Sequence, residues 1–169
     1  SDWRIYTPTA APVVFITASN GRHWTPWPDS AVLAYPGARI DHVVGMLNST
    51  AKHIDPGTKD IVFSIGLNDR QGDKTTFAQS IRELHAAAAK LPQRTHFLAI
   101  PHFKGQRGRT TDAVNLLNDL ASTSFSDRFI SLQPNFRVTG SGTDFSHYSV
   151  DDSKALQRAA HNHIKRCLN

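Results

Sequence analysis

The sequence has very little cysteine and no long apolar run. Cys167 is the only cysteine among the 169 residues, which excludes a disulfide within the chain and gives no sign of an oxidising compartment. The apolar runs are far too short to span a bilayer, and the first residues lack the basic-then-apolar layout of a secretory signal. These absences predict an intracellular, cytoplasmic protein. Cys167 has no conspicuous partner, so we expect it to be structural or incidental.

Familiar metal-binding patterns are also missing. The chain has nine histidines, but no two of them form a His-x-x-x-His pair, and there is no Cys-x-x-Cys pattern. His161 and His163 are two positions apart on an expected helix and therefore face different ways. The sequence predicts no metal site and no cofactor.

Composition describes an ordinary globular chain, with 39% hydrophobic and 20% charged residues. The length is typical of one domain, so we expect a single domain over residues 1–169, with residues 1–11 as an N-terminal arm. The formal net charge is +5. A basic balance is compatible with nucleic acid, an anionic membrane surface or an acidic substrate, and does not choose among them.

Apolar segments of strand type alternate with segments of helical period along the whole chain. Strands are expected at Pro12–Thr17, Ala31–Tyr35, Asp60–Ile65, Thr95–Ile100 and Arg128–Leu132. Helices are expected from Arg39 to before Asp55, at Lys74–Leu91, at Thr111–Ser122 and at Val150–Leu168. This alternation predicts an α/β protein, with a parallel sheet covered by helices on both faces.

Polar residues and glycine follow the expected strands at their carboxyl ends. Ser19 follows the first strand, Gly37 the second and Asn68 the third, while Asp144 and His147 lie between the fifth strand and the last helix. Ligands of open parallel sheets bind beyond these carboxyl ends. A serine close to a histidine and an acid is what nucleophilic hydrolysis requires, because the hydroxyl needs an adjacent base.

The order and spacing of these blocks resemble the SGNH (GDSL-type) hydrolase family over essentially the whole chain. Gly66–Asp69 matches the Gly-x-Asn-Asp block of that family, and Asp144–His147 matches its Asp-x-x-His block. Pro36-Gly37-Ala38 corresponds to the glycine block. The first block departs, because Thr17-Ala18-Ser19 stands where the family has Gly-Asp-Ser. The nucleophile is retained and the two residues before it differ.

The resemblance implies a flavodoxin-like, three-layer α/β/α sandwich with a five-stranded parallel sheet. It also implies a serine esterase that hydrolyses acetyl or lipid esters through an acyl-enzyme intermediate, without a cofactor. By the same resemblance, Ser19 is the nucleophile, His147 the base and Asp144 the acid that orients His147. The backbone N–H groups of Ser19 and Gly37 and the Asn68 side chain would form the oxyanion hole.

Other readings of the same residues stay open. The chain could be a catalytically weakened hydrolase-like domain that binds membrane lipid or nucleic acid, and Thr17-Ala18 would then mark the loss of catalytic function. The basic stretch Pro101–Arg109 could be a flexible, positively charged lip of the site or a plain solvated loop. Thr17–Gly21 is also one residue short of a Gly-x-Ser-x-Gly nucleophile elbow. However, that fold normally needs a longer chain, and its acid and base do not lie three residues apart. Trp24 and Trp27 could line an acyl pocket, lie at a membrane interface or pack in the core.

A narrower resemblance concerns Leu33–Arg39 and Ile61–Asp69. These segments look like the esterase domains encoded in the first open reading frame of some vertebrate non-LTR retrotransposons. The resemblance implies a larger parent protein that contacts nucleic acid through its other parts. The oligomeric state stays open.

Overall fold

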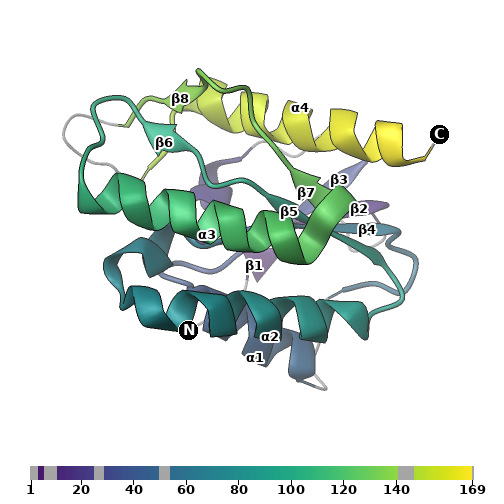
Figure 1. Cartoon of the computed structure of the whole chain (residues 1–169). Coiled ribbons are helices and arrows are strands. Elements are labelled where there is room, and N and C mark those ends of the chain that lie inside the picture. Colours follow the sequence, from purple (N-terminus) through teal and green to yellow (C-terminus); the bar gives the residue numbers. More distant parts are fainter. Residues whose placement is uncertain (1–3, 6–10, 25–28, 50–53, 141–146, 169) are drawn as a thin grey trace.

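The computed structural model describes residues 4–5, 11–24, 29–49, 54–140 and 147–168, and its core is a twisted sheet between two layers of helices (Figure 1). The sheet contains β1 (Arg4–Ile5), β2 (Val13–Thr17), β3 (Ser30–Ala34), β4 (Asp60–Ser64), β5 (Arg94–Leu98) and β7 (Phe129–Ile130). The strand order is β1-β3-β2-β4-β5-β7, and all neighbours from β3 to β7 pair in parallel. The five-stranded parallel sheet and its flavodoxin-like order are therefore confirmed.

The register of the central strands brings their carboxyl ends to one edge. Thr17, the last residue of β2, lies opposite Ala34 of β3 and Ser64 of β4. β2 and β3 are buried along their whole length, as expected for strands covered on both faces. The segments that follow Thr17, Ala34 and Ser64 consequently start side by side.

Successive side chains along a strand pack against the helices on opposite faces of the sheet. α1 (Ile40–Asn48), α2 (Phe77–Ala89) and α3 (Arg109–Phe125) pack together on one face, and α4 (Val150–Cys167) covers the other (Figure 1). Val14 and Ile16 of β2 belong to the core under α1, α2 and α3. Val13 and Phe15 belong to the core under α4, together with Leu156 of that helix.

The predicted helices and strands differ from the observed ones mainly at their ends. The expected helix at Lys74 begins with one 3₁₀ turn (Lys74–Thr76) before α2. The predicted N-terminal arm includes β1, which adds an antiparallel edge strand beside β3. Two paired residues show no detectable periodicity, so this strand has no signal in the sequence.

The basic stretch after β5 is not a plain solvated loop. Its first part forms β6 (His102–Phe103), which pairs in parallel with β8 (Arg137–Val138). The Lys104 N–H donates to the Val138 carbonyl at 3.0 Å, and the Phe103 side chain is buried. Lys104 and Arg107 themselves remain exposed. The exposed basic residues of this segment therefore follow a short, hydrogen-bonded strand.

Trp24 packs in the core rather than at a surface. Its side chain is buried among the residues under α4, and its ring meets that of Phe15 edge-on, with centroids 5.6 Å apart. The core-packing alternative is thus the one that holds for Trp24, while Trp27 lies outside the described residues. None of the helices in the described ranges combines the length and the apolar character needed to cross a membrane.

Two adjacent leucines of α3 test the assignment of its core face. Leu117 is 0% exposed and Leu116 is 36% exposed. We expect Leu117→Ala to lower the free energy of unfolding by about 2–5 kcal/mol, because the cavity forms in a packed core. Leu116→Ala should cost less than about 1 kcal/mol. Urea denaturation measures both, and equal losses would contradict the assigned face.

Candidate active site

Ser19 lies in the turn that ends β2. It is half-buried and begins a 3₁₀ helix over Ser19–His23. The Gly21 N–H donates to the Ala18 carbonyl at 3.2 Å and closes the turn. The abrupt end of the strand holds Ser19 at the carboxyl edge of the sheet.

Thr17 and Gly21 form a matched pair within this first block. The buried Thr17 hydroxyl lies 3.1 Å from the Leu33 carbonyl of the neighbouring strand and 3.2 Å from the Ala18 carbonyl. A Cβ atom on Gly21 would overlap the Thr17 Oγ1 atom. Gly21 thus leaves room for the Thr17 side chain. The family that the sequence resembles has a glycine at the position of Thr17.

Gly37 occupies the turn after β3. Its φ of +77° is in the left-handed region that favours glycine, and the Ala38 N–H donates to the Tyr35 carbonyl at 3.1 Å across the turn. The residue is exposed. Its backbone is therefore open to a ligand at the same edge of the sheet as Ser19.

Side-chain hydrogen bonds connect the segment after β4 to the segment after β3. The Asn68 side chain donates through Nδ2 to the Ala38 carbonyl at 2.9 Å. The Asp69 carboxylate accepts the Ile40 N–H, at 3.1 and 3.3 Å from its two oxygens. Before them, Gly66 has a φ of +116°, and a Cβ there would come 2.7 Å from Ile100 Cδ1. The predicted second and third blocks are thus brought together.

Asp69 is a buried carboxyl group next to Asn68. Burial raises its pKa from 3.8 to about 6, and the hydrogen bond from the Ile40 backbone offsets only part of that effect. Burial away from water disfavours the charged form. The group therefore titrates much closer to neutrality than an exposed carboxylate.

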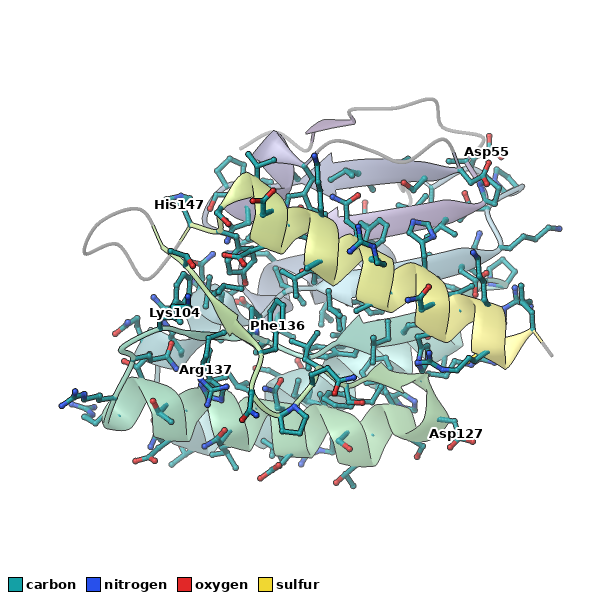
Figure 2. The ribbon with its side chains drawn as sticks, turned by 90° about the horizontal axis from the view of Figure 1, so that it is seen from above. Asp55, Lys104, Asp127, Phe136, Arg137 and His147 are labelled. Atoms are coloured by element: carbon teal, nitrogen blue, oxygen red, sulfur yellow. The ribbon has the colours of Figure 1, made fainter. Side chains whose placement is uncertain are left out.

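A long-range hydrogen bond connects the segment just before α4 to the turn after β2. The Tyr148 N–H donates to the Asn20 side-chain oxygen at 2.8 Å, across 128 positions of the chain. His147, the residue before it, is exposed. Figure 2 shows His147 near the start of α4, toward the same end of the molecule as Lys104 and opposite Asp55 and Asp127. Asp144 lies outside the described residues.

A pocket opens where these segments meet. Its lining comes from the ends of β2, β4 and β5 and from the start of the last block: Ala18, Asn20, Ser64, Ile65, Leu67, Leu98, Ala99, Ile100, Pro101 and Tyr148. Burial raises the pKa of the Tyr148 hydroxyl above its usual value, and the ring packs against Phe103, with centroids 5.7 Å apart. The hydroxyl therefore stays protonated.

Sequence reasoning missed two sets of residues. Asn20 and Tyr148 carry no chemical signature, so nothing in the sequence shows that they hold the first and last blocks together. At the opposite edge of the sheet, His96, His163 and Cys167 lie close to one another, and Cys167 Sγ is 3.4 Å from His163 Nε2. The expectation that Cys167 has no partner is therefore wrong. The four-residue step from His163 to Cys167 was the available signal.

No protein-family model matches the chain, and no curated protein sequence matches it either. Solved structures do match over nearly the whole chain. One is a lipase/acylhydrolase from Enterococcus faecalis, with a TM-score of 0.63, 15% identity, and coverage of 92% of this chain and 95% of the other.

Two further matches are similar. A GDSL-like lipase from Bacteroides thetaiotaomicron has a TM-score of 0.66 and 11% identity, covering 95% of this chain and 90% of its own. A member of the lipolytic protein G-D-S-L family from Veillonella parvula has a TM-score of 0.63 and 11% identity, covering 89% and 96%. The fold implied by the sequence motifs is thereby confirmed.

The pairing of Thr17 with Gly21 leads to a stability prediction. Gly21→Ala should lower the free energy of unfolding by about 2 kcal/mol or more, because the new methyl group overlaps the threonine hydroxyl. Thr17→Gly in the same chain should recover part of that loss, so that the two changes are not additive. Gly45→Ala is the matched control. It lies on α1 with open space around its Cβ position and should raise stability by about 0.5–1 kcal/mol. Equal effects of the two alanines, measured by denaturation, would contradict the pairing.

The raised pKa of Asp69 leads to a pH prediction. Its folded-state pKa of about 6 lies above the ordinary value of 3.8, so the folded chain binds this proton more tightly than the unfolded chain does. The stability from this group is fully present below about pH 4 and is lost as pH rises through about 6, by up to about 3 kcal/mol.

Asp69→Asn keeps an oxygen for the Ile40 N–H but cannot ionise. Its unfolding free energy should exceed that of the wild type at about pH 8, and the difference should vanish near pH 4. Chemical denaturation across this range measures it. Asp119→Asn, at an exposed position of α3, controls for the loss of one negative charge. A variant less stable than the wild type at every pH would show that ionisation of Asp69 is not penalised.

Proposed function

We propose that this chain, which has the fold of the SGNH hydrolases, is a serine ester hydrolase with Ser19 as its nucleophile. The observation that carries the proposal is the hydrogen bond between the Tyr148 N–H and the Asn20 side chain. It ties the residue after His147 to the residue after Ser19. A histidine and a serine from opposite ends of the chain thereby come to one edge of the sheet.

The chemistry follows from the properties of these groups. His147 would take the proton from the Ser19 hydroxyl as its oxygen attacks the ester carbonyl, since a serine hydroxyl is a poor nucleophile without a base. The alcohol would leave with that proton, and an acyl group would remain on Ser19. Water, activated by His147, would then release the carboxylic acid and restore the serine. In this proposal Asp144 orients His147 and balances the charge of its protonated form.

Three donors would hold the oxyanion of the tetrahedral intermediates. The Asn68 amide carries two N–H bonds, and one of them is used on the Ala38 carbonyl. That bond fixes the plane of the amide, so the second N–H has a defined direction. The backbone N–H groups of Ser19 and Gly37 would supply the other two donors. Donors held in place before the reaction stabilise the transition state most, because they need no reorganisation.

The pocket that opens between Ala18 and Asn20, the two neighbours of Ser19, is small, with a volume of about 20 Å³. Its lining includes the apolar side chains of Ile65, Leu67 and Ile100. Such a surface favours a hydrocarbon over a charged group. The proposed substrates are carboxylic esters, acetyl or lipid, and a long acyl chain would extend out of this small pocket.

Hydrolysis of p-nitrophenyl acetate, butyrate and octanoate tests the proposal. Turnover by the wild type should be abolished in Ser19→Ala and in His147→Ala, since neither variant can form the acyl-enzyme efficiently. Ser122→Ala, at an exposed position of α3, should retain full activity. The relative rates on the three esters report how far the pocket accepts an acyl chain.

Equal rates for the wild type and Ser19→Ala would overturn the esterase. Thermal melting of each variant shows whether a loss of activity comes from unfolding instead. If no variant differs from the wild type, binding to anionic vesicles and to RNA becomes the property to measure. The exposed cations Lys104 and Arg107 are the residues to change in that experiment.

A further inference from the structure

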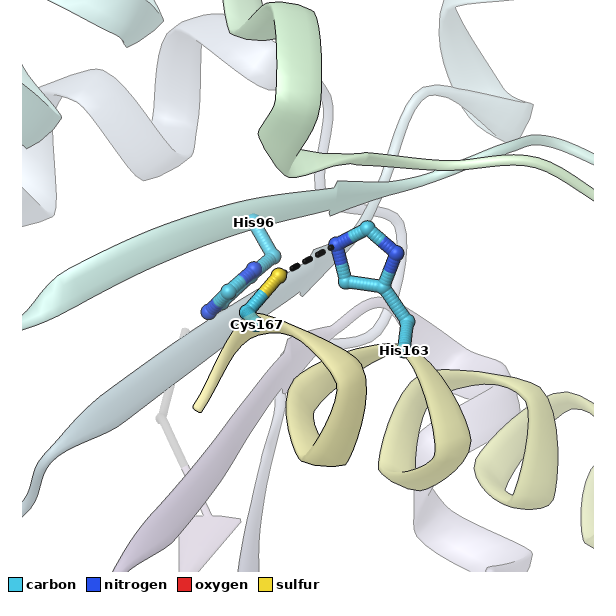
Figure 3. Close-up of side chains that lie close together, drawn as sticks. All are labelled: His96, His163 and Cys167. Carbon is cyan, nitrogen blue, oxygen red and sulfur yellow. Dashed lines mark hydrogen bonds between the residues drawn. The ribbon is translucent and has the colours of Figure 1, made fainter. Parts of the chain in front are cut away.

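Two histidines and the cysteine gather at the end of the sheet opposite the proposed active site. His96 is in the middle of β5, whereas His163 and Cys167 are on the last turns of α4 (Figure 3). One potential ligand atom from each residue lies within 4.8 Å of the other two. The two imidazole rings are 5.5 Å apart and nearly perpendicular. The cluster joins a central strand to the helix that covers it.

His96 is fully buried, and its contact with Asp60 fixes the orientation of its ring. Its Nε2 lies 2.8 Å from a carboxylate oxygen of Asp60, and Asp60 accepts two hydrogen bonds of 2.8 Å from the Arg94 guanidinium. Arg94 and Asp60 thus form an ion pair, with Nη2 and Oδ2 2.8 Å apart. An ionised carboxylate only accepts hydrogen bonds. Nε2 of His96 therefore carries a proton.

The other ring nitrogen of His96 has no partner within the described part of the chain. Nδ1 is buried and makes no hydrogen bond there, and in the neutral ring it carries a lone pair. A buried acceptor without a donor costs free energy. Figure 3 shows the His96 side chain beside Cys167 and opposite His163. His96 therefore has one buried ring nitrogen left to bind a further partner.

The two residues of α4 present matching donors. His163 and Cys167 are four positions apart and so share one face of the helix. Nε2 of His163 lies 3.4 Å from Cys167 Sγ, so the two donor atoms already lie close together on that face.

We propose that His96, His163 and Cys167 form a binding site for Zn²⁺ that clamps the end of α4 to β5. Two imidazoles and a thiolate are donors that zinc prefers, and the thiol would release its proton on binding. Histidine ligands of zinc commonly donate their second N–H to a carboxylate, as His96 does to Asp60. Cys167 is exposed, so water can supply the fourth ligand.

The geometry needs only a small adjustment. Ligand atoms about 2.0–2.3 Å from a tetrahedral ion lie roughly 3–4 Å from one another. Rotation of the Cys167 and His163 side chains, on the last turns of α4, would shorten the present separation of the ligand atoms to this distance. His96 needs no movement, because its ring is already fixed by Asp60. The role is structural, since the site lies at the other end of the sheet from Ser19.

Titration of the metal-free chain with Co²⁺ under reducing conditions tests the site directly. Cobalt replaces zinc in such sites and gives a thiolate-to-metal charge-transfer band when a cysteine binds it. We expect this band to saturate at one ion per chain and to disappear when Zn²⁺ is added. Cys167→Ser should lose the band, and His163→Ala should weaken binding by about tenfold or more.

His85→Gln is the matched control, because His85 is an exposed histidine on α2 away from the cluster. It should bind cobalt as the wild type does. Zn²⁺ should also raise the melting temperature of the wild type and of His85→Gln, but not that of Cys167→Ser, because an ion that binds only the folded chain stabilises it. Absence of the charge-transfer band, or the same band in Cys167→Ser, would overturn the proposal. None of these measurements depends on ester hydrolysis.

Discussion

The parallel register of β3, β2 and β4 is the constraint on which the proposed site depends. Because Ala34, Thr17 and Ser64 lie side by side at the strand ends, the turns that follow them share one edge of the sheet. Asn68 and Asp69 connect the segment after β4 to Ala38 and Ile40 after β3. Asn20 connects the turn after β2 to Tyr148, just before α4. A shift of one strand by a single residue would turn its side chains to the opposite face and break these links.

The first block shows how a local departure from a family pattern can leave the geometry intact. Thr17 stands where glycine is usual, yet its side chain is buried and hydrogen-bonded to the neighbouring strand. The space it needs is the space that Gly21 leaves. The departure is therefore compensated within five residues, and Ser19 keeps its place at the end of β2. Thr17 is thus accommodated by packing within the turn itself.

The two ends of the sheet carry different kinds of polar group. At the carboxyl edge, the turns that carry Ser19, Gly37 and Asn68 meet near a small pocket whose lining is partly apolar. At the amino edge, the buried side chains of Asp60 and His96 form a hydrogen-bonded network with the partly exposed Arg94, beside the end of α4. α4 spans both, since it starts just after Tyr148 and ends near Cys167. Whatever fixes one end of this helix helps to position the other, because a helix is stiff along its axis.

Much of this molecule was determined by the sequence alone. Short, nearly continuous apolar runs identify the five parallel strands, because both faces of these strands are buried. Apolar stripes of helical period identify the four long helices. The order of the polar blocks implies the fold, and the rule for parallel sheets places Ser19, Gly37 and Asn68 at one edge. Short elements such as β1, β6 and β8 could not be predicted, because two residues of strand depend on a partner distant in the sequence.

Only the tertiary structure decided which polar residues meet. Asn20 and Tyr148 are 128 positions apart, and nothing local to either residue specifies the contact. The same holds for His96, which reaches His163 and Cys167 only because α4 packs across β5. Periodicity records which face of an element is buried, but not which element covers it. Contacts between distant segments depend on the packing of the whole chain, so they appear only when the layers are assembled.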